Sequence, residues 1–158
     1  MGRWIARVCR ALAIAAGVIL VAMALMSLAS IVGRTLFGKP ITGDYELVQM
    51  MCAAAVSLTL PYAHWAGGHV IVDFLTARAS PGLRLLLDSV ADMLMAFAGA
   101  VMCMRLAVGM MDLRRNMDSS MLLGLPTWWG YAPMVVSFGM LTLTAGYILV
   151  ARIMGANR

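Results

Sequence analysis

Two histidines are the residues of this chain best suited to bind a haem or a metal ion. His64 and His69 are five residues apart, close to the expected end of a helix. A haem held by two histidines in a helical membrane protein takes its ligands from facing helices. Two histidines so close together on one segment are badly placed to face each other, and we expect no haem.

A pair of acids is the second candidate for chemistry. Asp88 and Asp92 are four residues apart, a spacing that places both on one face of a helix. Such a pair could hold a metal ion or carry a proton, but no third ligand lies nearby in the sequence. The simpler interpretation is a pair of interfacial acids that forms ion pairs with Arg84 or with a partner chain.

The other reactive residue types form no recognisable motif. The three cysteines, Cys9, Cys52 and Cys103, form no CxxC motif. Their spacing therefore predicts neither a disulfide framework nor a zinc site. No serine lies in a nucleophile elbow, and no glycine-rich phosphate loop is present. We therefore predict that the chain is not an enzyme and that it binds no metal or cofactor itself.

The composition indicates that membrane helices position these residues. Apolar residues make up 63% of the chain and charged residues 12%, whereas a soluble domain has about 25% charged residues. The formal net charge is +5, but the basic residues flank apolar runs, where they set topology and meet anionic lipid. We expect contacts with membrane lipids and no binding of nucleic acid.

Four segments are apolar enough to cross a bilayer, which takes about 20 residues of helix. The predicted fold is all-α, with a single membrane domain over residues 1–158, short loops and four transmembrane helices at about 11–33, 46–65, 83–111 and 127–151. The first segment also has features of a signal peptide, with a possible cleavage site at residues 27–30. Its apolar run exceeds the roughly 15 residues usual there, so we expect it to remain as a span.

The distribution of basic residues predicts the orientation of the spans. Four spans place both termini on the same side of the membrane. One side then holds seven arginines, namely Arg3, Arg7, Arg10, Arg78, Arg84, Arg152 and Arg158. The other side holds Arg34, Lys39, Arg114 and Arg115. The excess of positive charge favours both termini in the cytoplasm.

Five short motifs are spread along most of the chain. In order, they are RTLFG at 34–38, GDYEL at 43–47, LPYA at 60–63, GHVIVD at 68–73 and LPTW at 125–128. Together they resemble the small membrane subunit of tripartite ATP-independent periplasmic (TRAP) transporters, the DctQ family. Each motif alone is weak, but their order and spacing are specific. One departure is the pair Thr35 and Leu36, where the family often has an aromatic residue.

The resemblance implies a function in transport. The chain would be the small subunit of a sodium-coupled transporter for organic acids in the bacterial inner membrane. It would act as a static scaffold for a large, elevator-type membrane subunit that carries the substrate and sodium sites. A periplasmic substrate-binding protein would deliver the solute, and loops 34–46 and 112–126 could contact it.

The motifs also suggest which residues are important. The expected family-motif or structural residues are Arg34, Gly43, Glu46, Pro61, Gly68, His69 and Asp73. His69 and Asp73 are expected either to fix the turn after the second helix by hydrogen bonds or to contact the large subunit. Asp88, Asp92 and Arg105 are expected at the interface with that subunit, because ionisable groups facing lipid are costly.

Two alternatives remain open from the sequence. Arg34 and Glu46 could pair across the first connection, or they could be two separate solvated charges. The chain could also be a membrane anchor for an electron-transfer or sensory partner, which would predict a different partner or a bound chromophore.

Overall fold

Four long helices make up most of the computed structural model, which describes residues 2–38, 41–67 and 81–154. They are α1 (Gly2–Phe37), α2 (Asp44–Trp65), α4 (Pro81–Arg115) and α5 (Trp128–Ile153). All four are long and apolar enough to cross a membrane. The predicted all-α fold with four potential spans is therefore confirmed.

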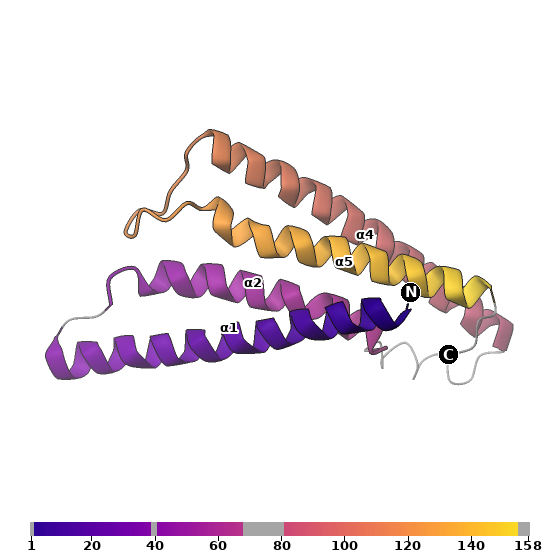
Figure 1. Ribbon diagram of the computed structural model, residues 1–158, viewed down its shortest axis with the longest axis horizontal. Helices are drawn as coiled ribbons and strands as arrows, with labels where there is room; N and C mark the ends of the chain where they lie inside the picture. Colours follow the sequence, from indigo (N-terminus) through magenta and orange to yellow (C-terminus); the bar gives the residue numbers. More distant parts are fainter. Residues whose placement is uncertain (1, 39–40, 68–80, 155–158) are drawn as a thin grey trace.

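The helices lie in a row one helix thick, in the order α1, α2, α5, α4 (Figure 1). The two edge helices, α1 and α4, are barely covered by the rest of the chain. In each of them 6% of the most apolar stretch is buried, whereas the buried share is 33% in α2 and 28% in α5. A compact four-helix bundle buries an apolar face of every helix around one core. This arrangement instead leaves broad apolar surfaces on the edge helices exposed.

Small side chains form the contacts between the helices. The buried positions include Ala16 in α1, Ala55 in α2 and Ala145 in α5. In α4, a Cβ atom placed on Gly99 would lie 2.8 Å from the hydroxyl oxygen of Thr142 and 3.4 Å from its backbone nitrogen. Small residues at such points let two helix backbones approach closely, which is the usual basis of helix association in membranes.

The two ends of the row differ. At one end, called here the termini end, α1 begins and α5 finishes, and the helix pairs α1–α2 and α4–α5 converge (Figure 1). There Cys9 Sγ of α1 lies 3.5 Å from Thr144 Oγ1 of α5, and Trp65 of α2 stacks on Tyr147 with ring centroids 6.1 Å apart. The opposite end, called the hairpin end, carries the connections from α1 to α2 and from α4 to α5.

Candidate functional site

The segment between α4 and α5 folds into a small hairpin, residues 116–127. A bridge pairs Ser119 with Pro126, and the N–H of Ser120 donates to the carbonyl of Leu125 at 2.9 Å. Gly124 closes the turn with a φ of 63°, a conformation that glycine adopts without strain. The hairpin carries Met121, which is 99% exposed, at its tip.

Glu46 of α2 fastens this hairpin to the rest of the molecule. Its Oε1 accepts the backbone N–H of Leu122 at 3.1 Å, and its Oε2 accepts that of Leu123 at 3.3 Å. Hydrogen bonds to a charged acceptor are stronger than those between neutral groups. Arg34 lies exposed in the last turn of α1. Within the described residues, no ion pair joins it to Glu46. Glu46 therefore binds the hairpin and is neither Arg34's partner nor a free solvated charge.

Gly43 and Asp44 shape the start of α2 beside the hairpin. Gly43 is buried with a φ of 77°, and its α-carbon packs against the side chain of Leu123. Any side chain there would meet both a strained backbone and Leu123. Asp44 accepts the hydroxyl of Ser30 in α1 and the N–H of Tyr45 at 2.8 Å. The GDYEL motif thus ties α1, α2 and the hairpin together.

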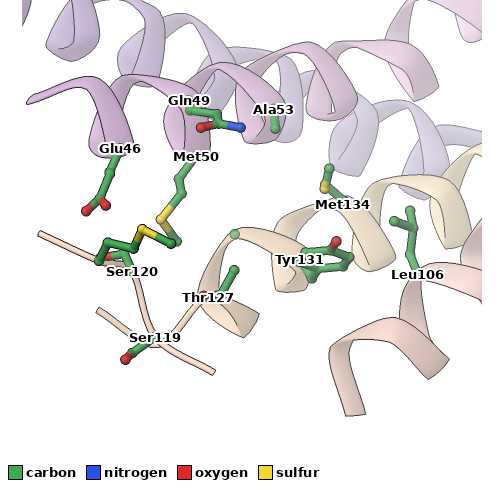
Figure 2. Close-up of a pocket in the computed structure, with 12 residues that line it drawn as sticks. Glu46, Gln49, Met50, Ala53, Leu106, Ser119, Ser120, Thr127, Tyr131 and Met134 are labelled. Atoms are coloured by element: carbon green, nitrogen blue, oxygen red, sulfur yellow. The ribbon is translucent and has the colours of Figure 1, made fainter. Parts of the chain in front are cut away.

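A groove opens beside this cluster, lined by residues of α2, α4, α5 and the hairpin (Figure 2). Its volume is about 460 Å³. Its floor is α5, its walls are α2 and Leu106 of α4, and the hairpin closes its outer end. The lining residues are Glu46, Gln49, Met50, Ala53, Leu106, Ser119, Ser120, Met121, Thr127, Gly130, Tyr131 and Met134. This set is called the hairpin-end groove below.

A network of charged groups joins three helices at the termini end. Asp92 of α4 is buried, and its Oδ1 lies 3.5 Å from Nε2 of the buried His64 in α2. Arg152 of α5 contacts Asp88 at 2.5 Å through Nη1 and Asp92 at 3.4 Å through Nε. Among the described residues, no three His, Cys, Asp or Glu side chains form a group that could hold a metal ion. The geometry is that of a structural link between helices.

The predicted interface residues therefore have different surroundings. Asp88 and Asp92 bind Arg152 within the chain, whereas the predicted partners were Arg84 or another chain. Arg105 is exposed on α4. It lies near the level of Val135 in α5, whose carbonyl accepts the thiol of Cys103 at 3.5 Å. Val135 lies about two helical turns further along α5 than Trp128 and Trp129, which start that helix. Among the exposed charged residues in the hairpin half of α4, Arg105 is therefore the furthest from the hairpin.

The remaining motif residues are only partly described. Pro61 lies inside α2 and is fully buried, and the helix continues past it to Trp65. Gly68, His69 and Asp73 lie outside the described residues, so their predicted roles stay predictions. His64 and Arg152 were not among the predicted site residues. The sequence could have identified Arg152 as a partner of the acids, because alternating spans place it on the same side of the membrane as Asp88 and Asp92.

Comparison with known families agrees with the motifs and the fold. The family model described as "Tripartite ATP-independent periplasmic transporters, DctQ component" matches residues 23–155, which is most of the chain. A search of curated proteins finds no matching relative. The family is one of transporter components and not of enzymes. The chain therefore belongs to the DctQ family, the small membrane component of TRAP transporters.

Proposed function

We propose that this chain is the small subunit of a sodium-coupled TRAP transporter for organic acids in the bacterial inner membrane, where it forms a fixed scaffold for a large, elevator-type subunit. Both of its termini would lie in the cytoplasm and its hairpin end would face the periplasm. The large subunit would carry the substrate and sodium sites.

The observation that carries this proposal is the single row of helices. Only 6% of the most apolar stretch of each edge helix is buried within the chain. Between membrane helices there is little hydrophobic driving force, so association depends on close packing and on polar contacts. The row offers a long face for such packing, and this supports a second membrane chain as its natural neighbour.

Two structural features suit the row to a static role. The link among His64, Asp92 and Arg152 holds α2, α4 and α5 together at the termini end. Glu46 and the hairpin join α2 to the α4–α5 pair at the other end. A scaffold on which another subunit moves must resist deformation, and a row fixed at both ends meets that requirement.

The exposed hairpin supports the proposed contact with a periplasmic binding protein. Met121 and Leu122 at its tip are 99% and 64% exposed, and Met117 is 88% exposed. Methionine side chains are flexible and adapt to varied surfaces. The hairpin would thus offer a fixed backbone with an adaptable apolar tip.

A pull-down tests the partner directly. The chain, tagged at its C-terminus, would be extracted from native membranes in mild detergent and its partners identified by mass spectrometry. We expect a much larger membrane protein in stoichiometric amount. A clean monomer, or a redox or signalling protein in its place, would contradict the proposal.

Transport by the purified complex tests the proposed substrate class, the sodium coupling and the need for a binding protein. In proteoliposomes, uptake of an organic acid should require a sodium gradient and the matching periplasmic binding protein. Uptake that is independent of either would contradict that part of the proposal. An absorbance spectrum of the same sample checks the electron-transfer alternative, which would require a chromophore.

A further inference from the structure

The hairpin-end groove has the properties of a lipid site, and we propose that it binds one phospholipid of the outer leaflet. One acyl chain would lie between α2 and Leu106 on the floor formed by α5, and an ammonium-bearing headgroup would lie beside Glu46. The choice of leaflet rests on the proposed orientation, in which the hairpin end faces the periplasm. The site itself does not depend on which subunit the chain binds.

The first argument is the order of polar and apolar residues along the groove. Its outer end has polar groups from Glu46, Ser120 and Thr127, close to the hairpin (Figure 2). Further from the hairpin its lining is mainly apolar, with Ala53, Leu106 and Met134, and its polar groups there are the amide of Gln49 and the hydroxyl of Tyr131 (Figure 2). An amphiphile with one polar end and one apolar chain matches this order, because its polar end would lie beside Glu46 and its chain beside the apolar residues.

The second argument is depth. Trp128 and Trp129 begin α5, and tryptophan is enriched where a helix leaves the hydrocarbon for the headgroups. The floor of the groove runs from Thr127 to Met134, about 10 Å along the helix axis at 1.5 Å per residue. The groove therefore starts at headgroup level and extends into the hydrocarbon.

The third argument is charge. Among the residues that the structure describes, Glu46 is the one charged residue that lines the groove. Its carboxylate accepts the N–H groups of Leu122 and Leu123, which favour the ionised form. An anionic headgroup would be repelled there, while an ammonium group would be attracted. Arg34, Arg114 and Arg115 also lie at the hairpin end but do not line the groove; Arg114 lies over the ring of Trp128 at 5.5 Å.

The floor of the groove depends on a missing side chain. A Cβ atom on Gly130 would lie 3.3 Å from the terminal methyl carbon of Met50 on the facing wall. A larger residue at position 130 would therefore occupy the space between floor and wall. Gly130→Leu is the direct test of occupancy, and Ala53→Leu narrows the same groove from α2.

Photolabelling can test the proposal on the chain purified with its membrane partner. The complex is placed in nanodiscs of phosphatidylethanolamine and phosphatidylglycerol in equal amounts. A trace probe of either lipid carries the same photoactivatable group in its acyl chain, and labelled peptides are mapped by mass spectrometry. Co-purification of the partner is measured on each sample, so that loss of the complex is distinguished from loss of the lipid.

We expect labelling at Met50, Leu106 and Met134, with the ethanolamine probe preferred about threefold, the size expected for one exposed charge pair. Gly130→Leu and Ala53→Leu should each lower this labelling at least several-fold. Val136→Leu is the matched control, because Val136 lies on the opposite face of α5 and is 55% exposed; it should leave the labelling unchanged.

Four results would overturn the proposal. The first is labelling of the Val136 face equal to that of the groove, and the second is groove labelling that neither Gly130→Leu nor Ala53→Leu lowers. The third is equal labelling by the two lipid probes, and the fourth is groove labelling that appears only after the partner is removed. The last result would assign the groove to a helix of the partner.

Discussion

The carboxylate of Glu46 accepts the backbone N–H of Leu122 at 3.1 Å, although the two residues are 76 positions apart in the chain. This contact connects the start of α2 with the hairpin that precedes α5. It places a conformational constraint on a loop whose tip is almost fully exposed. The contact explains why an acid is needed here, since a carboxylate offers two acceptor oxygens to two adjacent N–H groups.

Replacing Glu46 should loosen the hairpin. Glu46→Gln keeps one acceptor oxygen and puts an amide donor against the other N–H, which should weaken the local structure by about 1–3 kcal/mol. We expect the amides of Leu122 and Leu123 to exchange with deuterium at least about tenfold faster, since about 1.4 kcal/mol corresponds to a factor of ten. Asp112→Asn, which removes an exposed acid from α4, is the control. Unchanged exchange in Glu46→Gln would show that the hairpin is held by its internal bonds alone.

Gly99 should be intolerant of larger residues. Gly99→Ala brings a methyl group against the hydroxyl and backbone nitrogen of Thr142, and overpacking of this kind costs about 1–3 kcal/mol. The loss should appear as a lower free energy of unfolding in mixed micelles. Gly17→Ala in α1 is the matched control, because no atom lies within 4 Å of its added Cβ and alanine favours a helix. Equal stability of Gly99→Ala and the native chain would contradict the close approach of α4 and α5.

Removing Arg152 should destabilise the termini end. Arg152→Gln leaves Asp88 and the buried Asp92 close together without their common cation. Breaking a fully buried ion pair costs about 3–5 kcal/mol, and we expect about 2 kcal/mol here because the Arg152 side chain is 30% exposed. The measurement is unfolding in micelles, with Arg115→Gln, an exposed arginine of α4, as the control.

A double variant separates this ion pair from other effects of Arg152. Adding Asp88→Asn to Arg152→Gln removes one of the two stranded acids and should recover part of the lost stability. If the double variant loses as much stability as the sum of the losses in Arg152→Gln alone and Asp88→Asn alone, the contact contributes no coupling energy.

Arg105 tests the predicted subunit interface. A cation exposed within the hydrocarbon is costly unless it reaches the interface or a partner, so Arg105→Gln should reduce co-purification of the large subunit if it faces that chain. Arg114→Gln serves as the control, because Arg114 lies at the end of α4 over Trp128. Full co-purification of the Arg105 variant would place this residue towards lipid.

Much of the architecture follows from the sequence alone. The four apolar runs specify four spanning helices, because a backbone in lipid must satisfy its own hydrogen bonds and a helix does so within each segment. The GDYEL motif predicts Gly43 and Glu46 as family-motif or structural residues. In the structure Gly43 has a φ of 77° and Glu46 accepts the N–H of Leu122. The four spans and the motif positions are local properties, set by hydropathy, backbone conformation and spacing along one helix.

The partners of those residues were decided only by the tertiary structure. From the sequence, Glu46 could pair with Arg34 across a short loop, but in the structure its carboxylate accepts the N–H groups of Leu122 and Leu123. The sequence predicts that Asp92 pairs with Arg84 or with another chain, but in the structure it lies against His64 and Arg152. Periodicity shows which face of a helix a residue occupies and says nothing of which helix lies opposite. The order α1, α2, α5, α4 supplies that information, because packing of small residues brings α5 between α2 and α4.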